Sequence, residues 1–264
     1  MARNSLSRLL LLVLLAACGR AFEVKNYPAP ALLFEASMRE FERGEWDHAV
    51  LGFEELTLQL SPRDTLLPRS FYYLATAHGR KGEHLLAAQS FARLVETFPS
   101  DTLADDALFE AGQAYQRMWK KPELDPQYGE SALQTYRMLL SAYPDSPRKA
   151  DAEAAIAKLN QWFALKDFEN GMHYFRRKAY DPAIIYFKDV VARYPQTDAA
   201  RRSSLQMLES YRRVRYKEEA DELCATMRQT YPEDRDVRAA CGVAPTAAAS
   251  VPPSSPTSPP GPTP

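Results

Sequence analysis

The chain has 264 residues, 45% hydrophobic and 25% charged, which is enough apolar material for one sizeable core or two small ones and excludes a wholly disordered chain. Only 10 residues are glycine, and 8 of the 20 prolines fall in the last 20 positions, so a body poor in helix breakers predicts an all-α fold. Lysine plus arginine (33) nearly balances aspartate plus glutamate (34), which argues against nucleic acid as a partner.

The first eighteen residues have the pattern of a signal peptide. Arg3 and Arg8 precede an apolar run over 9–17, which is about half of the ~20 residues that a bilayer-spanning helix needs. The sequence Leu15-Ala16-Ala17-Cys18 resembles the lipobox of bacterial lipoproteins, whose cysteine is acylated after cleavage. We therefore expect residues 1–17 to be removed and lipid on Cys18 to anchor the chain, with no other cofactor. The alternative is an ordinary secretory peptide followed by a chance cysteine.

Residues 18–30 are predicted to be a lipidated tether. The twelve residues from Gly19 to Pro30 reach at most ~40 Å when fully extended. The first repeats should therefore lie close to the membrane.

A small residue, an aromatic residue and a proline then recur at fixed spacing. An alanine is followed four positions later by an aromatic residue or cysteine and twelve positions later by proline, in units marked by Ala87, Ala132, Ala183 and Ala220. An earlier unit at Ala49 has one extra residue. In paired helices the small residue allows close approach, the ring fills the gap, and proline ends the helix. The spacing resembles the second helix of the tetratricopeptide repeat and predicts an all-α solenoid of about five helical hairpins.

The predicted repeats follow one another along the chain: residues 31–100 hold repeats 1 and 2, residues 101–147 hold repeat 3 with an inserted loop, and residues 148–242 hold repeats 4 and 5. Between Lys149 and Lys178 there is no proline and a single glycine, which predicts one helix of about thirty residues. Asp181-Pro182 predicts the start of the next helix, with aspartate as its N-cap. Residues 243–264 carry no charge and are predicted to be a disordered Pro-rich tail.

The first helices of such repeats line a concave groove that holds peptide segments. Counted from Pro68 as position 1, repeat 2 presents Arg69, Tyr72, Tyr73, Thr76 and Arg80, and repeat 1 presents Phe34, Met38 and Phe41. Aromatic rings flanked by two arginines suit an apolar peptide that ends in an aromatic residue and a carboxylate. The alternative is that either tyrosine merely packs against neighbouring helices.

A basic stretch lies near the predicted end of the solenoid. It contains Arg201, Arg202, Arg212, Arg213 and Arg215. We expect an acidic protein partner to dock on it, with charge setting orientation and on-rate, and Arg212 with Arg215 as the best-placed pair. A solvated basic face and a lipid-headgroup patch are the alternatives.

Two cysteines remain if Cys18 carries lipid. Cys224 and Cys241 are 17 residues apart, in a compartment outside the cytoplasm where a disulfide persists. The alternatives are a bridge between them, or a buried Cys224 with a free thiol at Cys241.

No arrangement of residues predicts catalysis. The four histidines, His48, His78, His84 and His173, lack metal-ligand spacing, and no nucleotide-binding or nucleophile motif is present. Asp105 and Asp106 are adjacent in a predicted helix and face different directions. The chain is therefore predicted not to be an enzyme and to bind no metal.

The lipobox, the short tether and five repeats, with a loop at Asp125-Pro126-Gln127 and an over-long helix leading into repeat 4, together resemble the BamD family of outer-membrane lipoproteins. The resemblance implies a non-catalytic scaffold on the outer membrane, facing the periplasm, that helps to insert β-barrel proteins. Its implied partners are the barrel-forming subunit BamA, other assembly lipoproteins and unfolded outer-membrane protein substrates. It also implies that BamA docks on repeats 4 and 5. A generic periplasmic adaptor for cell-wall synthesis or division is the alternative.

Overall fold

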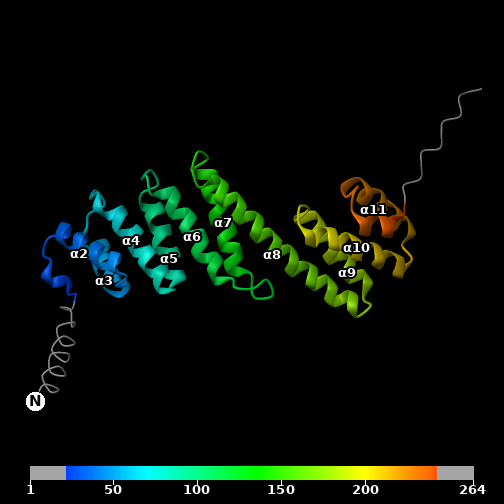
Figure 1. Ribbon diagram of the computed structural model, residues 1–264, viewed down its shortest axis with the longest axis horizontal. Coiled ribbons are helices and arrows are strands. Elements are labelled where there is room, and N and C mark those ends of the chain that lie inside the picture. Colours follow the sequence, from blue (N-terminus) through cyan, green and yellow to red (C-terminus); the bar gives the residue numbers. More distant parts are fainter. Residues whose placement is uncertain (1–21, 243–264) are drawn as a thin grey trace, which may run out of the picture. The chain divides into compact units, whose positions relative to one another are not determined.

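The computed structural model describes residues 22–242, and every regular element in that range is helical (Figure 1). A short 3-10 helix, η1 (Val24–Asn26), precedes α2 (Pro30–Arg43), α3 (Trp46–Gln59), α4 (Leu66–Lys81), α5 (His84–Thr97), α6 (Ala104–Met118), α7 (Gln127–Ala142), α8 (Lys149–Arg176), α9 (Tyr180–Arg193), α10 (Asp198–Val214), α11 (Lys217–Thr230) and α12 (Arg235–Cys241). The predicted all-α solenoid is confirmed, with successive helices paired as hairpins from α2 to α11. Among residues 22–242, no helix has both the length and the hydrophobicity to cross a bilayer.

The turns inside the first two hairpins are closed by glycine. Gly44 ends α2 and Gly82 ends α4, with φ of 79° and 83°. This left-handed conformation suits a residue without a Cβ atom. Each turn brings the following helix back along the preceding one.

The repeated alanines and aromatic residues form the hairpin interiors, as the spacing predicts. Ala87, Ala132, Ala183 and Ala220, with Phe91, Tyr136, Phe187 and Cys224 four residues later, are all at most 7% exposed. The facing helix leaves room for the rings: a Cβ atom on Gly112 would lie 2.6 Å from Cε1 of Tyr136, and one on Gly171 would lie 2.6 Å from Cε1 of Phe187. Such contacts are too short for any other residue without a shift.

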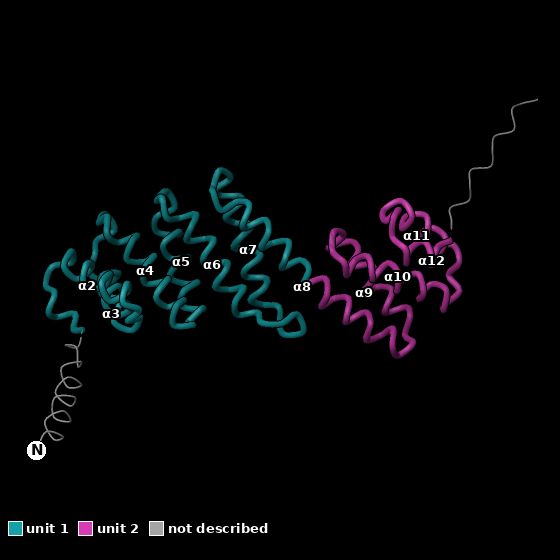
Figure 2. The backbone as a smooth tube through the Cα atoms, viewed as in Figure 1, with its two compact units in different colours: residues 1–162 teal, residues 163–264 magenta. Residues whose placement is uncertain are grey.

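The chain divides into two compact units, residues up to Trp162 and residues from Phe163 (Figure 2). The division falls inside α8, whose 28 residues confirm the predicted long helix. Unit 1 has one core around Leu33, Phe53 and Leu56 and another around Phe71, Phe91 and Leu94. Within unit 2, the Phe168 and Phe187 rings lie 5.8 Å apart and join α8 to α9.

Two local features differ from the predictions. Helix α9 begins at Tyr180 with Ala179 at its N-cap, so Asp181 lies inside the first turn and is not the cap. Its carboxylate instead raises the pKa of Tyr216, at the turn before α11. The second difference lies in residues 18–30, which are predicted to be a tether. Phe22 in this range stacks on Tyr27 and on His48 with centroid distances of 5.6 Å.

The packing of Phe22 shortens the effective tether. Cys18 lies outside the described residues, but four residue steps separate it from Phe22, and these span at most ~14 Å. A free chain from Gly19 to Pro30 would instead reach ~40 Å. An anchor on Cys18 would hold the first hairpin correspondingly closer to a membrane.

Candidate functional site

A groove of about 690 Å³ opens in unit 1 between α4, α5 and α6. We call it the first groove. It brings together five of the residues predicted from the repeat positions and adds others from α5 and α6; its polar and aromatic lining is Phe41, Tyr72, Tyr73, Thr76, Arg80, His84, Phe91, Glu110, Gln113 and Arg117.

The aromatic wall of the first groove is fixed by ring contacts. Tyr72 meets Phe91 edge to face at 5.4 Å, and Tyr73 lies 5.3 Å from Phe41 and stacks on Phe53 at 5.6 Å. Burial, with smaller effects of nearby carboxylates including Glu110, raises the pKa of Tyr72. The wall is therefore a set of rings held by their mutual contacts, in which Tyr73 both lines the groove and packs against the core.

The rim of the first groove carries two arginines without ion-pair partners among residues 22–242. Arg80 is exposed on α4, and Arg117 on α6 donates to Gln113 Oε1 at 3.0 Å. One carboxylate, Glu110, shares the lining. The groove thus combines apolar rings with a positive rim, a surface complementary to an apolar, negatively charged group.

His84 adds a buried polar atom to this groove. Its Nδ1 atom has no hydrogen-bond partner within the described part of the chain. Burial lowers the pKa of His84, and the neighbouring cations Arg117 and Lys120 lower it further. The imidazole is therefore held neutral in this setting, so the positive charge at the rim comes from the arginines.

Three residues predicted for the groove lie elsewhere. Phe34 is 6% exposed within the first core, and Met38 packs against that core. The guanidinium of Arg69 lies 4.8 Å from the centre of the Phe34 ring. The second arginine of the groove is thus Arg117, contributed by the next repeat, and not Arg69.

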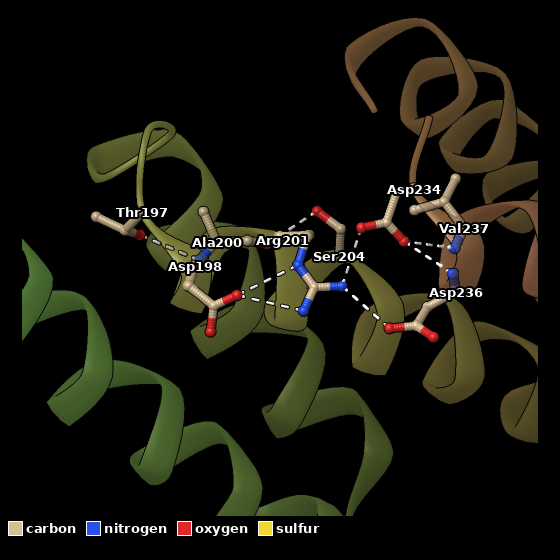
Figure 3. A network of polar contacts seen from close by, with 8 residues as sticks. All are labelled: Thr197, Asp198, Ala200, Arg201, Ser204, Asp234, Asp236 and Val237. Carbon is tan, nitrogen blue, oxygen red and sulfur yellow. Dashed lines mark hydrogen bonds and ion pairs between the residues drawn. The ribbon is translucent and has the colours of Figure 1, made fainter. Parts of the chain in front are cut away.

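In unit 2, Arg201 is the centre of an internal ion-pair network (Figure 3). Its guanidinium nitrogens lie 3.2 Å from carboxylate oxygens of Asp198, Asp234 and Asp236. Asp234 also caps α12, accepting hydrogen bonds from the backbone nitrogens of Asp236 and Val237. Arg201 therefore joins the start of α10 to the start of α12.

The other predicted docking arginines differ in how far they are engaged. Arg202 lies over the Phe168 ring at 4.2 Å, and Arg213 pairs with Glu209 at 2.7 Å. Arg212 donates to the carbonyl of Ala240 at 2.6 Å. Arg215, exposed at the end of α10 with φ of 68°, forms no ion pair within residues 22–242.

The two remaining cysteines are joined in the structure. Cys224 on α11 and Cys241 at the end of α12 form a disulfide with Cα atoms 5.4 Å apart. Arg228 donates to the carbonyl of Cys241 at 2.8 Å. Helix α12 is thus held by covalent and polar contacts at both of its ends.

The aspartates and the histidine that the sequence offers as candidates for chemistry make structural contacts. Asp105 accepts a hydrogen bond from Ser146 at 2.6 Å, and Asp106 pairs with Arg148 just before α8. His78 pairs with Glu83 at 2.7 Å. Among the residues that the structure describes, no group of three or more His, Cys, Asp or Glu side chains is placed to hold a metal ion.

Paired helices with an open groove on their first helices define a repeat protein of tetratricopeptide type, a class that binds polypeptide segments. The model of the family described as YfiO, outer membrane lipoprotein, matches residues 28–226. The chain therefore belongs to this family, and the resemblance drawn from its sequence is confirmed.

Several relatives carry the name outer membrane protein assembly factor BamD, among them proteins from Vibrio cholerae and Caulobacter vibrioides. The protein from Vibrio cholerae is 25% identical over 230 residues, which cover 81% of this chain and 92% of the relative. The protein from Caulobacter vibrioides is 26% identical over 204 residues, covering 77% and 67%. A solved structure of the P58(IPK) tetratricopeptide domain overlaps 80% of this chain and 55% of that one, with 15% identity and a TM-score of 0.43.

Proposed function

We propose that this chain is a non-catalytic lipoprotein scaffold for assembly of outer-membrane β-barrel proteins, and that its first groove binds the C-terminal peptide of an unfolded substrate. Membership of an outer-membrane lipoprotein family and the names of its relatives support the assembly role. The observation that carries the peptide site is the pair Arg80 and Arg117 at the rim of an aromatic groove.

The chemistry of the groove fits a chain end better than an internal segment. A C-terminal carboxylate accepts hydrogen bonds from guanidinium groups, and Arg80 and Arg117 have no other anionic partner within residues 22–242. A terminal aromatic side chain would pack on Tyr72 and Phe91. The binding free energy from one buried ring and one paired carboxylate is comparable to that of an anchor residue in a protein interface.

A peptide ending in phenylalanine tests this site. In the Tyr72→Ala, Arg80→Ala variant we expect its binding to weaken by more than about 1 kcal/mol, measured by fluorescence anisotropy, with helicity by circular dichroism unchanged. The matched control is Arg137→Ala, an exposed arginine on α7 outside the groove. Equal binding by the double variant and the wild type would place the peptide elsewhere.

Acylation of Cys18 would anchor the scaffold to the outer membrane with unit 1 facing the periplasm near the lipid surface. Three acyl chains at ~0.8 kcal/mol per buried CH₂ make a stable anchor. Mass spectrometry of the outer-membrane fraction should find Cys18 as the modified N-terminus. A soluble mature form with an unmodified cysteine would contradict the anchor.

The exposed part of the basic stretch is the proposed docking site for the barrel-forming subunit, BamA. Arg212 and Arg215 are exposed near the end of α10, whereas Arg201 and Arg202 are engaged inside unit 2. Reversing both exposed charges in Arg212→Glu, Arg215→Glu should cost several kcal/mol against an acidic partner. Arg212 also donates a hydrogen bond to the Ala240 carbonyl, so its replacement changes the structure as well as the charge. The single variant Arg215→Glu separates these two effects, and Arg177→Glu serves as an exposed control. Normal complex formation by all three variants would leave the stretch as a solvated face.

The proteins that co-purify with the chain distinguish the two function classes. Affinity purification in mild detergent should recover a barrel protein with periplasmic repeats and other assembly lipoproteins. Recovery of cell-wall enzymes alone would favour the generic periplasmic adaptor.

A further inference from the structure

A second pocket, of about 710 Å³, lies in unit 1 between α6, α7 and the first half of α8. We call it the basic pocket. It shares Gln113 and Arg117 with the first groove, and its other lining residues differ from those of that groove. Its volume is within the ~300–1,000 Å³ range of ligand sites.

The charge of this pocket is unbalanced. Arg148 and Asp151 in its lining already face one another at 3.6 Å, and Arg148 also pairs with Asp106. Arg117, Lys120 and Lys158 also line the pocket and form no ion pair with any residue between 22 and 242. Three cations from α6, the α6–α7 loop and α8 therefore surround one depression without a carboxylate of their own.

Apolar surface lies between these cations. Phe109 is buried under the guanidinium of Arg148 at 5.2 Å, and Trp162 meets the buried Trp119 edge to face at 5.3 Å. Ala154 and Ala155 line the pocket on α8. A ligand that fills the pocket must offer apolar groups as well as negative charge.

We propose that the basic pocket binds an acidic segment of a partner polypeptide in extended form. Its carboxylates would pair with Arg117, Lys120 and Lys158, and an apolar or aromatic side chain would rest on Trp162. Charge complementarity selects this occupant. The chain's own residues 243–264 contain no acidic side chain, so they do not form the acidic segment. A bilayer presents a flat layer of headgroups, whereas the lining here comes from three helices and a loop around a depression.

The inference goes beyond the proposed function and does not depend on it. Lys120 and Lys158 do not line the first groove, so their replacement leaves the proposed site for chain ends in place. A probe peptide without a free C-terminus removes the group that the first groove is proposed to bind. Failure at one site can therefore be measured separately from failure at the other.

The test uses the chain with Cys18 replaced by serine, so that no lipid contributes, and the fluorescent peptide Gly-Glu-Asp-Phe-Glu-Asp-Gly blocked at both ends. We expect the peptide to bind with an affinity that falls as salt is added and that is about tenfold weaker when glutamine and asparagine replace its acidic residues. The Lys120→Gln, Lys158→Gln variant should also bind about tenfold more weakly. The Lys149→Gln control, an exposed lysine of α8 outside the pocket, should bind as the wild type does.

Two results would overturn the proposal. One is equal binding of the acidic peptide by the double lysine variant and the wild type, with unchanged circular dichroism spectra. The other is absence of peptide binding together with lysine-dependent binding of vesicles of phosphatidylglycerol and phosphatidylethanolamine, which would assign the cations to lipid headgroups.

Discussion

Arg80 and Arg201 both lie on the first helix of a hairpin, yet their guanidinium groups have different surroundings. Arg80, in unit 1, faces an open groove and pairs with no carboxylate among residues 22–242. Arg201, in unit 2, is shared among three aspartates and is largely covered, with 27% of its side chain exposed. Arginine is therefore available to pair with a ligand in unit 1, whereas in unit 2 it holds α12 in place through ion pairs.

This difference shows how a basic stretch should be interpreted. Local charge between Arg201 and Arg215 predicts one docking surface, but most of the arginines there have partners inside the fold. In unit 1 the arginines and lysines are scattered along the sequence, and the packing of α4, α6 and α8 collects them around two pockets. Unpaired charge in the folded state, and not density of charge in the sequence, marks the better candidate for binding.

The largest expected effect concerns the fastening of α12 in unit 2. Replacing Cys224 and Cys241 by alanine removes a crosslink over 17 residues. The free energy of unfolding of unit 2 should fall by about 3 kcal/mol, the scale for a loop of this length, measured by urea denaturation. Peptide mapping without reductant should also recover the two cysteines as one linked species. Free thiols, or an unchanged free energy of unfolding, would contradict the stabilisation of α12 by this disulfide.

Arg201 should have the next largest effect. Arg201→Ala leaves Asp234 without its partner, so we expect a loss of about 1–2 kcal/mol in the free energy of unfolding. Arg215→Ala, at the C-cap of the same helix but without an ion pair among the described residues, should change it by less than about 0.5 kcal/mol. The contrast between unit 1 and unit 2 predicts that Arg80→Ala resembles Arg215→Ala in stability. Equal losses of unfolding free energy in all three variants would show that the ion pairs of Arg201 do not stabilise unit 2.

The smallest effect is a pH dependence at the first groove. Burial and the cations Arg117 and Lys120 lower the pKa of His84 in the folded chain, so the unfolded chain binds more protons as pH falls below the ordinary histidine pKa of about 6.5. Stability is therefore complete above that pH and declines as pH falls toward the folded pKa. Between pH 7.5 and 5.5, His84→Gln should lose less stability than the wild type. Parallel curves for the wild type and His84→Gln would contradict the lowered pKa of His84.

The sequence predicted the repeat architecture because its alanines, rings and prolines encode close packing within each hairpin. It also located Tyr72, Tyr73, Thr76 and Arg80, since these positions lie on one face of a single helix. It missed Arg117, because that residue enters the groove from the next repeat and counting positions within one repeat does not describe how two repeats pack. Phe34 lies in the core although its position in the repeat predicts the groove, because hydrophobic spacing alone does not distinguish a groove wall from a core.

Recognition of a chain end by Arg80 and Arg117 is tested with two peptides of the same sequence ending in phenylalanine, one with a free carboxylate and one with a C-terminal amide. Binding to the wild type and to Arg80→Gln, Arg117→Gln forms a double-mutant cycle. We expect the amide to bind the wild type more weakly than the free acid by about 1–3 kcal/mol, and the two peptides to bind the arginine variant equally. If the amide binds the wild type as tightly as the free acid, the arginines of the first groove do not recognise a chain end.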